Sequence, residues 1–204
     1  MESHKGYMRA CLYENLRELM LKNLFEKITI KQICDATGVI RATFYNYFDD
    51  KYDCLNAIVY HDFVESFHAE QVSKSLQSES DGQNEFVPTA SSSKIVENNI
   101  QCILEIIEKN RSFYRVAYNV TGQNSFEDMV RNNLVIILKT LLNEHRKPNY
   151  MTKYSNELLA RYFAECIAFD IKEFVFQKYA KLTVADTKTM ILDLMKNGIN
   201  DFLQ

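Results

Sequence analysis

The sequence contains few residues that break regular structure. Its 204 residues include only five glycines and two prolines. Because glycine and proline mark most tight turns, their scarcity favours long helices over many short strands. Hydrophobic residues make up 47% of the chain and charged residues 25%, the balance of an ordinary globular protein. We therefore predict an all-α fold.

Features of membrane, secreted and metal-binding proteins are also missing. No apolar run approaches the roughly 20 residues that a membrane-spanning helix needs, and the first residues lack the apolar core of a signal peptide. The five cysteines are scattered, without the paired spacing of a zinc site or a disulfide framework. Of the histidines, only His61 and His68 could share a helix face, and no carboxylate pattern accompanies them. We predict a cytoplasmic protein with no metal, no cofactor and no membrane contact.

The sequence has no recognisable catalytic motif. It lacks a glycine-rich phosphate loop, a nucleophile elbow and a pair of catalytic carboxylates. An α-helical enzyme is therefore disfavoured, and we predict no enzymatic activity.

The net charge of −3 provides no overall attraction to nucleic acid, so a DNA-binding surface would have to be local.

The N-terminal part shows a series of helix signals. Apolar residues recur at helical spacing from Tyr7 to Leu24 and alternate with the polar residues Arg9, Glu14, Arg17 and Lys22. Thr29 and Gln32 have the spacing of a capping box, which begins a second, short helix. Gly38 ends that helix, because glycine readily adopts the left-handed conformation that turns the chain out of a helix.

A third short helix has two contrasting faces. Phe44 and Phe48 are four residues apart and can share a buried face. The opposite face carries Arg41, Ala42, Thr43, Tyr45, Asn46 and Tyr47. Asp50 and Asp53 repeat the cap spacing, and a long helix runs from Lys51 into the early seventies. Two short helices joined by a glycine turn predict a helix-turn-helix, whose second helix can enter the major groove of DNA.

The remainder of the chain is predicted to be helical apart from one segment. Residues 75–93 lack periodicity and are predicted to form a mobile loop or linker. Helical patterns then cover residues 95–109, 112–120, 126–143, 155 to about 179, and 184–203. Together with the N-terminal helices, these patterns predict about nine helices.

Segment 28–51 combines several spaced residues that are specific as a set. They are Ala36-x-Gly38-Val39, then Thr43-Phe44-Tyr45-x-x-Phe48, then Lys51 at the start of the next helix. This pattern resembles the signature of the TetR family. The resemblance implies a homodimeric DNA-binding transcriptional regulator. It places a three-helix helix-turn-helix domain over residues 1–52 and a helical regulatory and dimerisation domain over residues 53–204.

The resemblance also assigns residues to a DNA surface. Thr29 and Lys31 would meet the phosphate backbone, and Lys51, beside the positive end of its helix, would hold another phosphate. Tyr45 and Tyr47 would combine groove contacts with phosphate hydrogen bonds. The positions that face base edges in this family are Arg41, Ala42, Thr43 and Asn46. Arginine suits guanine, asparagine suits adenine, and the methyl group of Thr or Ala suits the thymine methyl, so the chemistry agrees with the assignment.

Three residues at two places depart from the family's pattern. Ile40 stands where similar sequences usually carry a capping Ser or Thr, so it would forgo a cap worth about 1 kcal/mol. Its side chain could instead pack inward or touch a thymine methyl. Asp49 and Asp50 stand where related sequences often carry cations. They would repel phosphate unless they are used to cap the helix that begins at Lys51.

The C-terminal part is expected to carry dimerisation and regulation. Apolar stripes on the last two helices are more extensive than one bundle needs to bury, and in this family that pair packs against its copy as a four-helix bundle. A two-fold dimer implies a roughly palindromic operator. In the family, a ligand bound among the C-terminal helices swings the long fourth helix and changes the separation of the two reading heads. Candidate pocket or core residues are Phe67, Ile103, Ile107, Phe113, Tyr114, Tyr118, Ile137 and Phe163.

Two modes of control remain open. The leading hypothesis is a repressor released by a small-molecule effector. The rival hypothesis makes the C-terminal domain a protein-binding module without a ligand pocket, so that a protein partner gives the signal to a regulator or activator. Segment 110–115 and the later Phe126-x-x-x-Val130 faintly resemble regulators of dihydroxyacetone kinase genes, in which a protein partner can act as coactivator or supply the effector. A ligand-sized cavity with a few polar groups would favour the first hypothesis, and a solid core with an exposed apolar patch the second.

Overall fold

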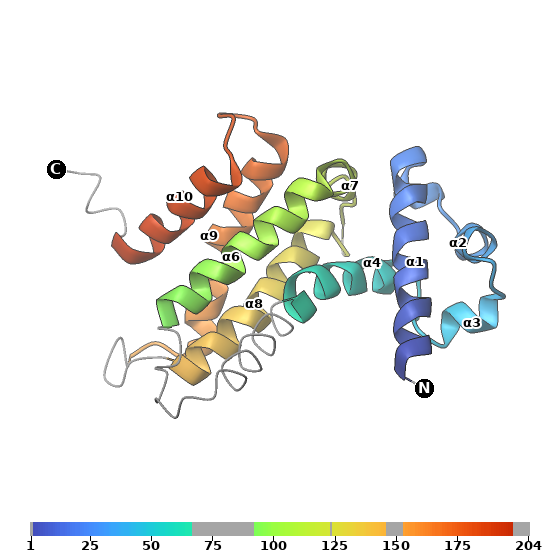
Figure 1. Ribbon diagram of the computed structural model, residues 1–204, viewed down its shortest axis with the longest axis horizontal. Helices are drawn as coiled ribbons and strands as arrows, with labels where there is room; N and C mark the ends of the chain where they lie inside the picture. Colours follow the sequence, from blue (N-terminus) through green and yellow to red (C-terminus); the bar gives the residue numbers. More distant parts are fainter. Residues whose placement is uncertain (1, 67–91, 123, 146–152, 198–204) are drawn as a thin grey trace, which may run out of the picture. The chain divides into compact units, whose positions relative to one another are not determined.

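The computed structural model describes residues 2–66, 92–122, 124–145 and 153–197. These residues form nine α-helices, one 3-10 turn and one π-helical turn, with no strand among them (Figure 1). The chain divides into two compact units, Met1–Tyr60 with Asn110–Met129, and His61–Lys109 with Val130–Gln204. The predicted all-α fold is therefore confirmed.

The first unit contains the predicted N-terminal helices. Its elements are α1 (Glu2–Lys22), the 3-10 turn η1 (Phe25–Lys27), α2 (Ile30–Thr37), α3 (Arg41–Tyr45), α4 (Lys51–Tyr60), α7 (Arg111–Ala117) and the start of α8 (Phe126–His145). α1 contacts α2, α4 and α7. Its buried side chains include Leu12, Leu16 and Met20, which follow the helical spacing expected from the sequence. α1 is thus the support on which α2 and α4 are packed.

Arg17 does not lie on the polar face of the first helix, where the sequence pattern placed it. Its side chain is buried, and its guanidinium lies over the ring of Phe113 on α7, 4.5 Å from the ring centroid. Phe113 in turn makes edge contacts with Tyr114 and Phe126. A cation over an aromatic face is favourable, more so when the pair is shielded from water. The core of this unit therefore includes a charged residue that helix periodicity alone could not assign to it.

The second unit is a separate packing of longer helices. It contains the π-helical turn η2 (His61–Glu65), α6 (Ser92–Lys109), most of α8, α9 (Asn156–Phe176) and α10 (Val184–Asn197). α6 contacts η2, α9 and α10. Polar pairs join further helices: Lys139 Nζ lies 2.7 Å from Glu157, which links α8 to α9, and Lys188 Nζ lies 3.1 Å from Glu97, which links α10 to α6. The core of this unit is mainly aliphatic.

The helix boundaries differ from the predicted ones at several points. α1 begins at Glu2, five residues before the predicted start, and η1 follows it. Ser92 and Ser93 begin α6 instead of ending a loop, while the remainder of the predicted loop over 75–93 lies outside the described residues. The predicted continuation of the fourth helix beyond residue 66, and the last helix beyond residue 197, lie outside them too. The proposed boundary between residues 52 and 53 stays a prediction.

Candidate functional site

The turn between α2 and α3 depends on the backbone of Gly38. Its φ of 73° and ψ of 31° lie in the left-handed region, and its N–H donates to the Asp35 carbonyl. The next N–H, that of Val39, donates to the Cys34 carbonyl at 3.0 Å. A Cβ at position 38 would meet no atom within 4 Å, so the requirement for glycine is conformational and not steric crowding. As predicted, Gly38 ends α2 and redirects the chain into α3.

The start of α2 is held by the predicted capping box. Thr29 Oγ1 accepts from the Gln32 N–H at 3.2 Å, and Gln32 Oε1 accepts from the Thr29 N–H at 2.8 Å. These bonds satisfy backbone donors that a helix start would otherwise leave free. Thr29 and Lys31 are both exposed, so the head of α2 is open to an external partner.

α3 is anchored on one face only. Phe44 and Phe48 are buried, with ring centroids 5.6 Å apart, and Phe48 also contacts Tyr13 of α1 at 5.9 Å. This confirms the predicted buried face. On the other side Arg41, Ala42, Tyr45 and Asn46 are exposed, while Thr43 and Tyr47 are partly exposed. Six of the residues assigned to DNA contact therefore gather on the outer side of the α3 segment.

The outer face of α3 can make several kinds of contact with a nucleic acid. Arg41 supplies paired N–H donors, and Asn46 supplies both a donor and an acceptor. Tyr45 offers an aromatic ring and a hydroxyl, and 54% of its surface is exposed. An exposed set of this kind matches what base edges and phosphates require.

Lys51 begins α4 as predicted, but its side chain does not take the predicted outward role. Its ammonium donates to three backbone carbonyls of the η1 region, those of Phe25 (2.8 Å), Glu26 (3.1 Å) and Ile28 (2.9 Å). It also lies 4.7 Å from the centroid of the Phe25 ring. Partial burial lowers the pKa of Lys51. Because an ammonium has three donors, these bonds use all of them, and Lys51 braces the domain instead of reaching outward to a phosphate.

A signal in the sequence could have indicated this role. A cation in the first turn of a helix lies beside the positive end of the helix dipole, which is unfavourable. A lysine there needs negative partners elsewhere, and the carbonyls around η1 supply them. The sequence does not show which backbone carbonyls lie close to the Lys51 ammonium.

The two aspartates before α4 differ in their roles. Asp50 Oδ1 accepts from the N–H groups of Tyr52 (2.7 Å) and Asp53 (2.8 Å), and Asp53 Oδ2 accepts from the Asp49 N–H at 3.0 Å. The predicted use of Asp50 as a cap is confirmed. Asp49 contributes its backbone N–H to this arrangement, and its exposed carboxylate adds negative charge beside α3.

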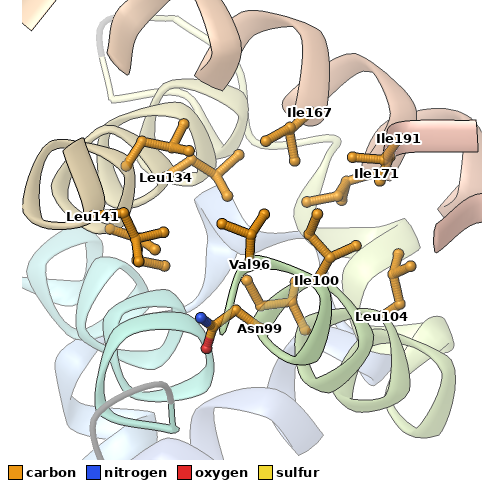
Figure 2. A pocket seen from close by; sticks show the side chains of 12 residues that line it. Val96, Asn99, Ile100, Leu104, Leu134, Leu141, Ile167, Ile171 and Ile191 are labelled. Atoms are coloured by element: carbon orange, nitrogen blue, oxygen red, sulfur yellow. The ribbon is translucent and has the colours of Figure 1, made fainter. Parts of the chain in front are cut away.

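The second unit contains an apolar cavity of about 30 Å³. Figure 2 shows aliphatic side chains from several helices converging on it. Its described lining residues are Val96, Asn99, Ile100, Ile103 and Leu104 of α6, Leu134, Ile137, Leu138 and Leu141 of α8, Ile167 and Ile171 of α9, and Ile191 of α10. Of these, Asn99 alone is polar, and its Nδ2 donates to the Ile95 carbonyl at 2.6 Å. The cavity has room for about two water molecules.

The predicted pocket residues are distributed over both units. Ile103 and Ile137 line the cavity, and Ile107 is buried on α6 without lining it. Phe163 is partly exposed and contacts the ring of Tyr162 at 5.4 Å. Phe67 lies outside the described residues. The three remaining aromatics, Phe113, Tyr114 and Tyr118, pack around Phe126 in the first unit and not at this cavity.

Among the described residues, no three His, Cys, Asp or Glu side chains gather closely enough to hold a metal ion. His61 Nδ1 lies 3.2 Å from Asp62 Oδ1, and His68 lies outside the described residues. No described helix is both long enough and apolar enough to cross a membrane.

Two family models match the chain. The one described as "Bacterial regulatory proteins, tetR family" matches residues 13–58, which include α2, the Gly38 turn and α3. The one described as "Transcriptional regulator C-terminal region" matches residues 96–174. No curated protein matches the chain significantly.

Solved structures of several regulators share the fold. DhaS, described as the dihydroxyacetone kinase operon activator, is 18% identical with a TM-score of 0.61, over 92% of this chain and 93% of DhaS. FadR from Bacillus subtilis in complex with stearoyl-CoA is 16% identical with a TM-score of 0.62, over 95% and 100% of the two chains. The repressor FadR from Thermus thermophilus in complex with lauroyl-CoA is 17% identical with a TM-score of 0.57, over 94% of each chain. At these identities the likeness shows the fold and assigns the chain to no particular branch.

Local geometry and sequence comparison lead to the same assignment. The capping box, the left-handed Gly38 and the anchored α3 form a helix-turn-helix within the segment that the N-terminal family model matches. The C-terminal match covers most of the second unit's helices. The chain belongs to the TetR family of bacterial transcriptional regulators, which bind DNA through the helix-turn-helix and are not enzymes.

Proposed function

We propose that this regulator recognises a defined DNA sequence by placing α3 in the major groove. The observation that carries the proposal is the two-sided character of α3: Phe44 is held in the core while Arg41, Tyr45 and Asn46 are exposed. In this arrangement Arg41 pairs with guanine and Asn46 with adenine, and Ala42 and Thr43 contact base edges beside them. Thr29, Lys31, Tyr45 and Tyr47 hold the phosphates, and Lys51 serves the fold of the domain.

The proposal includes a homodimer that forms through the last two helices. Four large apolar side chains on α9 are exposed at helical spacing: Leu158, Tyr162, Phe169 and Phe176. Residues four and seven apart lie on one helix face, and an exposed apolar row of this length favours contact with a second copy. A two-fold pair of helix-turn-helix domains reads half-sites roughly 34 to 36 Å apart, which requires a nearly palindromic operator.

Selection of bound duplexes from random DNA tests both points. We expect an enriched, nearly palindromic sequence with half-sites about one helical turn apart. Arg41→Ala should lower affinity for that sequence about 10- to 100-fold and relax the preference at one base pair of each half-site. Lys31→Ala is the matched comparison: it should weaken binding to all duplexes alike and reduce the salt dependence by about one unit of slope. A selection without consensus would contradict the proposal, and a single unrepeated half-site would contradict the dimer.

For control of DNA binding, we propose repression that is relieved by a small molecule with an aliphatic chain. The support is the cavity among α6, α8, α9 and α10, whose lining is aliphatic apart from Asn99. Two regulators of the same fold are described with stearoyl-CoA and lauroyl-CoA. A ligand of that size has to widen a cavity of about 30 Å³. To release DNA, it must also bind the DNA-free state more tightly than the DNA-bound state.

A second candidate keeps DNA recognition but assigns control to a protein partner. It is favoured by the small volume of the cavity, which leaves little room for a ligand. DhaS, which shares the fold, is described as an operon activator.

Adding acyl-CoAs of graded chain length to the protein–DNA complex distinguishes the two candidates. We expect longer acyl chains to release the wild type from its selected duplex. Ile137→Phe should bind the duplex normally and resist release, because its larger side chain fills part of the cavity. Free CoA and short-chain acyl-CoAs serve as controls for the headgroup. If no chain length releases the wild type, the effector proposal fails and control by a protein partner takes its place.

A further inference from the structure

An isoleucine begins the recognition helix. Ile40 is the N-cap residue of α3, with φ −83° and ψ 157°, and its side chain makes no capping hydrogen bond. Isoleucine is among the least favourable N-cap residues, because it has no oxygen to accept from the free N–H groups of the first turn. The position therefore gives up a local stabilising interaction that Ser, Thr, Asp or Asn would provide.

The side chain of Ile40 gains nothing from the protein interior in return. It is 71% exposed, which excludes the inward packing that the sequence left open. A single exposed aliphatic residue is ordinary on a protein surface. What distinguishes Ile40 is its position at the head of α3, directly before the exposed Arg41 and Ala42 that are assigned to DNA.

The major groove offers an aliphatic side chain one apolar partner. Each base pair presents hydrogen-bond donors and acceptors there, and a pair that contains thymine also presents the C5 methyl group. Residues at the N-terminal end of a helix-turn-helix recognition helix are those that contact base edges. We propose that Ile40 contacts a thymine methyl in each half-site and thereby fixes thymine at that position. This inference rests on the proposed insertion of α3 into the major groove.

The chemistry of the contact also explains why other bases are rejected. Ile40 has no donor or acceptor in its side chain, so it would cover the polar edge of guanine, cytosine or adenine without replacing the hydrogen bonds to water. Beside thymine, the same side chain removes two apolar surfaces from water at once. Ile40 is thus a specificity residue, whereas a Ser or Thr at this position would mainly cap α3.

Replacing thymine by deoxyuridine tests the contact, because it removes the methyl group and leaves base pairing intact. In the duplex selected by the wild type, each thymine is replaced in turn. At one position per half-site we expect wild-type affinity to fall about fourfold, the effect of one buried methyl group. Ile40→Ser should bind the thymine and uracil duplexes equally. The melting temperature of Ile40→Ser should rise, because serine caps α3. Any loss of DNA affinity in this variant therefore cannot come from unfolding.

Leu24→Ser is the matched control. Leu24 is also an exposed aliphatic N-cap residue without a side-chain cap bond, at the start of η1 in the same unit. This variant should keep the full preference for thymine over uracil. The inference is overturned if no uracil weakens wild-type binding, or if uracil weakens Ile40→Ser as much as the wild type. In both cases the selected duplex is still bound, so the proposed function stands. If the wild type selects no duplex, the proposed function fails and this inference fails with it.

Discussion

Replacement of Lys51 by methionine is expected to lower the free energy of unfolding by about 3 kcal/mol. Methionine keeps a stem of similar length but removes the ammonium, which leaves the carbonyls of Phe25, Glu26 and Ile28 without their donor. Hydrogen bonds to a charged group contribute more than neutral ones, and the three contributions are not independent because they share one ammonium. DNA affinity should also fall, because Lys51 ties the start of α4 to the segment that leads into α2.

Urea denaturation followed by circular dichroism measures this effect. Lys31→Met is the control, since it removes an exposed lysine of the same unit and should change stability by no more than about 0.5 kcal/mol. The two lysines should also differ in the binding assay: Lys31→Met should reduce the salt dependence of DNA binding, and Lys51→Met should not. If Lys51→Met left stability unchanged and reduced the salt dependence of DNA binding, Lys51 would contact a phosphate, as the sequence predicted.

The elements that the sequence predicted correctly depend on residues close together in the chain. The capping-box residues Thr29 and Gln32 are three residues apart, the buried Phe44 and Phe48 are four apart, and Gly38 acts through its own backbone. In such local patterns, both interacting residues lie within the same short stretch of sequence. They are therefore sufficient to place a helix-turn-helix and to say which side of α3 is exposed.

The features that the sequence did not predict depend on distant partners. Lys51 binds carbonyls 23 to 26 residues earlier, and Arg17 lies over Phe113 of α7. The residues next to Lys51 and Arg17 in the sequence do not indicate which distant groups these side chains contact. Helix periodicity identifies apolar faces but does not say which faces meet, so it could not tell cavity walls from core. The cavity is aliphatic apart from Asn99, and three of the aromatic residues first assigned to a pocket, Phe113, Tyr114 and Tyr118, instead pack in the first unit.

Adjacent residues of α3 should give opposite results when each is replaced by alanine. Phe44 is fully buried, so Phe44→Ala should destabilise the protein by about 3–5 kcal/mol through lost burial and the cavity that remains. Tyr45 is 54% exposed, and its ring contacts Phe44 edge-on at 5.8 Å. Tyr45→Ala should therefore cost no more than about 1 kcal/mol of stability, yet lower DNA affinity about 10-fold or more.

Stability from urea denaturation and affinity from fluorescence anisotropy, both at low temperature, separate the two effects. Phe44→Leu should recover most of the stability and the DNA affinity, because an apolar side chain again fills the site. Tyr45→Phe should retain the ring in the groove and lose only the hydroxyl contact, so its affinity should lie between those of the wild type and Tyr45→Ala. If Tyr45→Ala destabilised the protein as much as Phe44→Ala and left DNA binding unchanged, the exposed face of α3 would not be the face that contacts DNA. The proposal that α3 enters the major groove with this face would then have to be abandoned.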